Sequence, residues 1–309
     1  FFFKQKTAYE IRNCDWSSDV CSSDLNWSSG TVPTTNDPVL INTNTTVNVQ
    51  SNSSAGALTL SGNNARINVQ ANVPLTASGI TYTGTSGNNV PIYMDAGTLT
   101  LNGGAGSMTT SGGVTSYLHI NGDVTLNLAS ANLTYLWLKS GGGAPAQLSI
   151  TNGQTFTAAV TYLAGIPASG QSTLNLNGGT LNAGTMIFNV TAGAYTNTFN
   201  LNSGGLLTAD TIRRDFDGTS LAFNWNDGTI QNPSGGNLSI SRGGSATTNM
   251  ILSLAATGTH TFNADSGRTI TVASTATLAD KTGEKGTLRK TGAGQLIFQD
   301  RKSTRLNSS

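Results

Sequence analysis

The residues best suited to catalysis form one short charged run, Arg213, Arg214, Asp215 and Asp217, which ends at Gly218. Two carboxylates beside basic groups are typical of the acid and base of a glycosidase or polysaccharide lyase. They are also typical calcium ligands, but the run lacks the alternating oxygen ligands and the terminal glutamate of an EF-hand loop. A loop between strands with local Arg–Asp pairing is the simpler interpretation. We therefore treat these four residues as weak catalytic candidates only.

The chain has two histidines, His119 and His260, and each lies in a segment of alternating polar and apolar residues. Neither has an acidic or cysteine neighbour at the spacing that metal ligands require. We therefore expect both on the surface, and we predict no metal site, no cofactor and no catalytic constellation.

Several aromatic residues are scattered through the chain. An exposed ladder of such rings binds glycans by stacking, although roles in the core or at the ends of coils are the more common use of large aromatic side chains. The residues considered are Trp27, Trp137, Trp225, Tyr135, Tyr162 and Tyr195.

The overall composition excludes several classes of protein. The 309 residues carry a formal net charge of +1 and are only 10% charged. A nucleic-acid-binding protein needs a basic surface, so we expect no nucleic-acid partner. No apolar stretch is long enough to span a membrane as a helix.

Both ends of the chain differ in composition from the body. Residues 1–25 and 300–309 are rich in charged residues, and the first segment holds both cysteines, Cys14 and Cys21. These segments resemble translated sequencing adapters, read in opposite orientations at the two ends. We therefore expect native sequence only from Asn26 to Gln299. That body is formally neutral and has no cysteine, which excludes disulfides and thiol catalysis within it.

The body shows a period of two residues, typical of strands with one buried and one solvated face. In the segment 173–177, Leu174 and Leu176 are expected to point inward, while Thr173, Asn175 and Asn177 face solvent. Glycine and asparagine, which tolerate positive φ, follow most of these segments and predict turns.

The strand-and-turn unit recurs along the chain. We align its second apolar position at Leu101, Ile120, Ile150, Leu176, Leu201 and Trp225. A unit of roughly 25 residues without a helix predicts one coil of a right-handed parallel β-helix, or β-solenoid. Repeated β-sandwiches are the alternative, because they too contain short alternating strands. Asparagines in register, such as Asn177 and Asn202, are expected to stack as amide ladders.

Two segments point to a family. The segment 286–298 resembles the autotransporter-associated β-strand repeat, and Asn26-Trp27 to Ile41 is similar to the segment that opens such passengers. In the repeat we expect the glycines to form a tight corner and the lysine to lie on the solvated face, where it discourages sideways pairing. The matching positions are Leu288, Lys290, Gly292, Gly294, Leu296 and Phe298.

The resemblance implies a structural passenger that is secreted or displayed on a bacterial surface, with a role in adhesion or in the extracellular matrix. Its implied partners are glycans or other cell-surface molecules. It would reach a membrane only through a C-terminal barrel or sorting segment that this sequence lacks. A polysaccharide lyase or glycosidase on a β-helix, and a glycan-binding module, are the alternatives.

Overall fold

The computed structural model describes residues 9–11, 14–15, 33–41, 46–61, 63–85, 89–139, 145–163, 169–190, 192–281 and 285–299. The expected adapter segments lie outside this part of the chain, apart from two short strands near the N-terminus. Trp27 also lies outside it. By contacts the chain divides into two compact units, Phe1–Ser149 with Gln154–Ala158, and Ile150–Gly153 with Ala159–Ser309.

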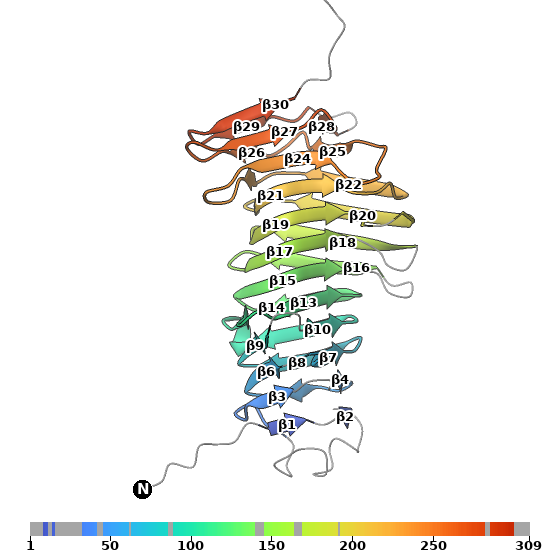
Figure 1. Cartoon of the computed structure of the whole chain (residues 1–309), viewed down its shortest axis with the longest axis vertical. Helices are drawn as coiled ribbons and strands as arrows, with labels where there is room; N and C mark the ends of the chain where they lie inside the picture. The colour runs from blue at the N-terminus through green and yellow to red at the C-terminus, as the bar shows by residue number, and fades with distance from the viewer. Residues whose placement is uncertain are drawn as a thin grey trace, which may run out of the picture. The chain divides into compact units, whose positions relative to one another are not determined.

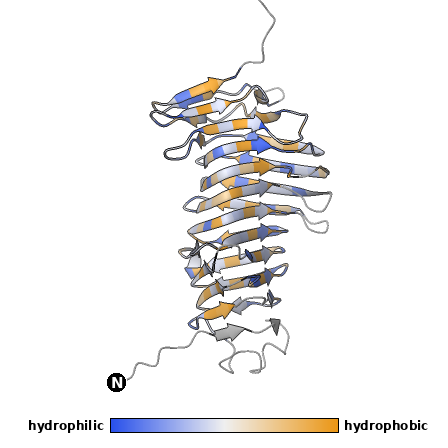
Figure 2. Ribbon diagram, in the orientation of Figure 1, coloured by the Kyte–Doolittle hydropathy of each residue, from blue (hydrophilic) through white to orange (hydrophobic). Residues whose placement is uncertain are grey.

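The chain folds as a right-handed parallel β-helix of about nine turns, as the repeat predicts (Figure 1). Strands of neighbouring coils pair in parallel, and apolar and polar residues alternate along them (Figure 2). The β-sandwich alternative, whose sheets are antiparallel, is therefore wrong.

In the first unit, one sheet supplies most strands of each coil and a second sheet supplies one. The first sheet contains β1 (Tyr9–Ile11), β2 (Cys14–Asp15), β3 (Val39–Ile41), β4 (Thr46–Val49), β6 (Ala57–Ser61), β7 (Arg66–Val69), β9 (Gly79–Thr83), β10 (Asn89–Met94), β12 (Ser107–Thr110), β13 (Thr115–Ile120) and β15 (Ser130–Leu138). The second contains β5 (Ser53–Ser54), β8 (Val73–Ala77), β11 (Gly97–Leu101) and β14 (Asp123–Asn127), and a short 3₁₀ turn spans Asn102–Gly104.

Two strands, β16 (Ala146–Thr151) and β17 (Thr155–Leu163), contain residues of both units. In the second unit, the first sheet continues with β19 (Thr180–Phe188), β21 (Leu206–Arg214), β23 (Thr229–Gln231), β24 (Leu238–Arg242), β26 (His260–Asn263), β27 (Thr269–Val272), β29 (Leu288–Thr291) and β30 (Gln295–Phe298). The second sheet continues with β18 (Ser169–Asn177), β20 (Ala194–Leu201), β22 (Ser220–Trp225), β25 (Met250–Leu254) and β28 (Ala276–Asp280).

The cross-section of the coil changes along the chain. The long strand β15 pairs with both β12 and β13, and β21 pairs with both β23 and β24, so a long strand replaces two short ones. The length of a coil, counted as the residues between register partners in neighbouring coils, varies accordingly. Leu118 pairs with Leu136, whereas Phe223 pairs with Leu252, which is farther along the chain.

The predicted inward positions form the core of each unit. Leu174 and Leu176 are buried and pair with Phe199 and Leu201 of the next coil. The alignment of Leu176, Leu201 and Trp225 is thereby confirmed. The alignment of Ile120 with Leu101 is wrong, because Ile120 belongs to β13 of the first sheet, whereas Leu101 ends β11 of the second. Sequence spacing alone does not separate two sheets that share one period.

Amide ladders run along the outer face of the second sheet. Asn200 donates from Nδ2 to Oδ1 of Asn175 at 2.7 Å, and Asn224 donates to Oδ1 of Asn200 at 2.8 Å. The predicted ladder of Asn177 and Asn202 lies beside this one; it is confirmed, and it continues to Asn226.

Replacing Asn200 by alanine is expected to lower the free energy of unfolding by about 1–2 kcal/mol, because it removes two half-buried hydrogen bonds. Thr198→Ala, on the same face of β20, is the control and should cost less. The double variant Asn175→Ala/Asn200→Ala should cost less than the sum of the single variants, since both remove the same bond. Urea denaturation measures all four, and strict additivity would show that the ladder carries no energy.

Candidate functional site

The charged run lies at the end of β21 and in the loop that follows it. Arg213 holds Asp215 through two contacts, Nε to Oδ1 at 2.8 Å and a guanidinium N–H donated to Oδ2 at 3.1 Å. Arg214 is nearly buried, contacts Oδ1 of Asp217 at 3.1 Å and donates from Nε to the carbonyl oxygen of Phe216. The local Arg–Asp pairing expected from the sequence is therefore what the structure contains.

Asp217 also fixes the loop of the next coil. Its Oδ2 accepts hydrogen bonds from the backbone N–H of Thr247 at 2.8 Å and from the Thr247 hydroxyl at 2.5 Å. Its Oδ1 accepts a bond from the backbone N–H of Thr248 at 3.1 Å. These bonds, those from Thr247 above all, hold the pKa of Asp217 well below its usual value. A general acid needs a raised pKa, so this environment is suited to a structural anchor.

His119 is nearly buried, with 6% of its surface exposed, so the expectation of a surface histidine is wrong. It does point outward, but aromatic rings of its own and neighbouring strands cover it. Tyr93 of β10 stacks on it at 4.4 Å between ring centroids, and Trp137 of β15 lies at 5.2 Å. We call the rings of Tyr93, Tyr117, His119, Tyr135 and Trp137 the aromatic ladder.

The ring faces of the aromatic ladder contact one another or cations. Tyr117 and Tyr135 stack at 4.8 Å, the guanidinium of Arg66 lies 3.8 Å from the ring centroid of Tyr93, and Lys139 Nζ lies 5.9 Å from that of Trp137. Glycan stacking needs open ring faces. The aromatic ladder is therefore better suited to holding the strands β10, β13 and β15 together than to binding a glycan.

Burial lowers the pKa of His119 to about 4, and the positive charges of Lys139 and Arg66 add to the effect. Its Nδ1 has no hydrogen-bond partner among the described residues. His119 is therefore neutral at neutral pH and packs as an aromatic ring.

His260 is fully buried and points inward beside Phe262, so the surface expectation is wrong here too. Its Nδ1 lies 2.8 Å from the carbonyl oxygen of Thr287, and its ring packs edge-on against Trp225 at 5.5 Å. The sequence contained the signal for this: Phe262, two residues after His260, lies on the same face of the strand, and its apolar side chain marks that face as the inward one.

The remaining aromatic candidates divide between core and surface. Trp225 and Tyr195 are buried core residues. Tyr162 is half-buried on the outer face of β17.

The repeat motif forms β29, a turn and β30. Gly292 has a φ of 73°, and Cβ atoms built at Gly292 and Gly294 would run into the carbonyl oxygens of Ala264 and Asp265 in the coil below. The predicted tight corner is thereby confirmed. Lys290 is exposed, but the expectation that it lies on the solvated face is wrong: it pairs with Phe262, whose side chain points inward.

Gly292→Ala is expected to destabilise the last coil more than Gly267→Ala. Gly267 has nearly the same φ, 70°, but a Cβ there meets nothing within 4 Å. Both variants lose about 1–2 kcal/mol from the left-handed backbone, and the clash at Gly292 adds about 1–3 kcal/mol. Hydrogen exchange of β29 and β30 measures the difference, and equal effects would contradict the close approach.

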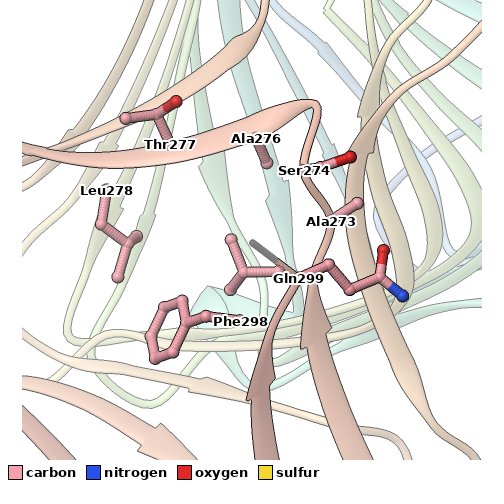
Figure 3. Close-up of a pocket in the computed structure, with 8 residues that line it drawn as sticks. Ala273, Ser274, Ala276, Thr277, Leu278, Phe298 and Gln299 are labelled. Atoms are coloured by element: carbon pink, nitrogen blue, oxygen red, sulfur yellow. The ribbon is translucent and has the colours of Figure 1, made fainter. Parts of the chain in front are cut away.

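A cavity of about 520 Å³ opens at the last coil, between the end of β27, β28 and β30 (Figure 3). None of the lining residues that the structure describes is titratable: they are Val272, Ala273, Ser274, Ala276, Thr277, Leu278, Phe298 and Gln299. Figure 3 shows Phe298 and Leu278 beside this space. Its described lining is mostly apolar and offers no acid–base group.

Within the part of the chain that the structure describes, no group of three or more His, Cys, Asp or Glu side chains lies close enough to hold a metal ion. The same residues include no helix long and apolar enough to cross a membrane. Comparison with protein-family models, with curated proteins and with solved structures finds no match.

Proposed function

We propose that this chain is a structural β-solenoid segment of a secreted or surface-displayed bacterial passenger, with a role in adhesion or in the extracellular matrix. The main support is that its polar side chains form hydrogen bonds within the fold. The asparagine ladders bond coil to coil, and the densest charged run anchors a loop through Asp217. The rings of the aromatic ladder, which could otherwise bind a ligand by stacking, stack on one another.

The resemblance of the segment 286–298 to the autotransporter-associated β-strand repeat supports secretion or surface display. Its glycines form the corner between β29 and β30, and this corner brings the last coil against Ala264 and Asp265. A repeat built this way adds coils without side-chain bulk at the corner, which suits a long passenger.

Display on a cell surface tests the proposal. The chain is fused behind a signal peptide and ahead of an outer-membrane barrel, and cells are treated with protease. We expect a surface-accessible product that resists cleavage within the described strands, because their backbone is paired between coils. The variant Phe223→Asp, which puts an unpaired charge in the core, should be degraded. Intracellular retention of the unmodified chain, or cleavage as rapid as that of the variant, would contradict the proposal.

The enzyme alternative has its own test. A polysaccharide lyase or glycosidase would act on acidic polysaccharides and lose activity in Asp215→Asn or Asp217→Asn. The proposed function predicts no turnover by the unmodified chain, and turnover that either substitution abolishes would replace it.

A further inference from the structure

A groove of about 400 Å³ lies on the outer face of the first sheet in the second unit. Polar side chains from neighbouring strands line it: Thr229 and Gln231 of β23, Thr261 and Asn263 of β26, and Thr291 of β29. They alternate with the buried residues Ile230 and Phe262, so they point away from the core. One end is lined by Gly204, Gly205 and Gly228, where no side chain narrows the groove. Its volume lies within the range of small-ligand sites.

The amides in this groove differ from those of the asparagine ladders. Gln231 and Asn263 are register partners, as Asn200 and Asn224 are on the second sheet. Asn224 donates to Asn200, but within the described residues no hydrogen bond joins the amides of Gln231 and Asn263. Asn263 instead accepts a bond at its Oδ1 from the Thr291 hydroxyl at 3.1 Å. The Gln231 amide and the Asn263 Nδ2 therefore keep hydrogen-bonding capacity for a molecule in the groove.

The chemistry of the lining indicates an uncharged ligand rich in hydroxyl groups. No described residue of the lining is charged, and Arg289, the register partner of Thr261, is not part of it. Threonine hydroxyls and the amides of asparagine and glutamine each offer both donors and acceptors. The hydroxyl groups of a neutral sugar also donate and accept, so the two sets are complementary. An acidic ligand would find no cation in the described lining.

A peptide or a lipid fits this groove less well. The strands β21, β23 and β26 are each paired on both sides, so they offer no backbone edge to an added strand. Leu206, which is half-buried, is the large apolar residue of the described lining. Apolar side chains or an acyl chain would therefore find little apolar cover there.

We propose that this groove binds a neutral oligosaccharide through hydrogen bonds with Gln231, Asn263 and the threonine hydroxyls. The inference rests on the adhesive role proposed above, and it gives that role a site and a class of ligand. Because paired strands hold the lining residues in place, little conformational freedom of the backbone is lost on binding.

Saturation-transfer NMR with the full chain tests this proposal, because the method detects weak binding. The neutral probes are maltohexaose, cellohexaose, mannohexaose and chitohexaose, and the acidic probe is hexagalacturonate. We expect saturation transfer to at least one neutral probe and none to hexagalacturonate. The neutral signal should be the same in low and high salt, since no charges attract the ligand.

Variants locate the site on the groove. In calorimetry with the bound neutral probe, Gln231→Ala and Asn263→Ala should each weaken binding by about fivefold or more, the usual effect of losing a hydrogen bond. Gln171→Ala is the matched control, because it removes an amide from an exposed position on β18 of the second sheet. It should bind as tightly as the unmodified chain.

Three results would overturn the proposal. One is no transfer to any neutral probe while circular dichroism shows folded protein. Another is transfer to hexagalacturonate alone, which would assign an acidic ligand to a charged surface elsewhere. The third is neutral binding that neither Gln231→Ala nor Asn263→Ala weakens, which would place the site outside the groove. The protease test of surface display uses no saccharide, so its failure is distinguishable from each of these.

Discussion

Replacing Leu252 by alanine is expected to lower the free energy of unfolding by about 2–5 kcal/mol, the usual cost of truncating a buried leucine. Leu252 is fully buried on β25, between Phe223 of the preceding coil and Leu278 of the next. Since an inner column of apolar side chains holds the coils together, a cavity there should weaken contacts on both sides.

The neighbouring Ile251 provides a matched control. It lies on the same strand but points outward, with 40% of its surface exposed. Ile251→Ala should therefore cost about 1 kcal/mol or less, mostly through lower strand propensity. Equilibrium denaturation in urea gives both values. A larger loss at Ile251 than at Leu252 would mean that the strand faces the other way.

The second large effect is a loss of stability in mild acid that depends on His119. Its pKa is about 4 in the folded chain, against 6.5 for an ordinary histidine. Between these values the unfolded chain binds more protons than the folded one, so the free energy of unfolding rises with pH. The stabilisation is fully present above pH 6.5 and is lost as the pH falls to 4. The total is about 3 kcal/mol, at 1.36 kcal/mol per pKa unit.

His119→Phe isolates this effect, because phenylalanine keeps a ring in the aromatic ladder and has no proton to bind. Acidic groups with lowered pKa values, such as Asp217 and Asp227, also weaken the fold at low pH, but they do so equally in both proteins. The difference between the two stabilities should therefore shift by about 3 kcal/mol between pH 7 and pH 4. Parallel stability curves would show that His119 is as solvated when folded as when unfolded.

The architecture could be predicted from the sequence because two local signals agree. Alternation fixed which side of each strand is buried, as at Leu174 and Leu176, and glycine marked the turns, as at Gly178 with a φ of 83°. The amide ladders followed from the repeat spacing alone. Each of these depends on residues close in sequence or one repeat apart.

The errors arise where neighbouring coils decide the environment. His119 does face outward, but Tyr93 and Trp137, from strands before and after it, remove it from water. Lys290 occupies the register position of the inward residue Phe262, because β29 pairs with β26. Coil lengths differ, so such partners cannot be assigned by counting residues.

Disulfide formation between coils tests the stacking directly. Thr173 and Thr198 are register partners at outward-facing positions of the neighbouring strands β18 and β20. Their Cα atoms are therefore expected about 4.8 Å apart. With Cys14 and Cys21 replaced by serine, the pair Thr173→Cys/Thr198→Cys should oxidise readily, whereas Thr173→Cys/Thr196→Cys, one pleat out of register, should not. Rapid oxidation of only the in-register pair is the predicted result. Equal oxidation of both pairs, or of neither, would contradict the parallel stack of coils.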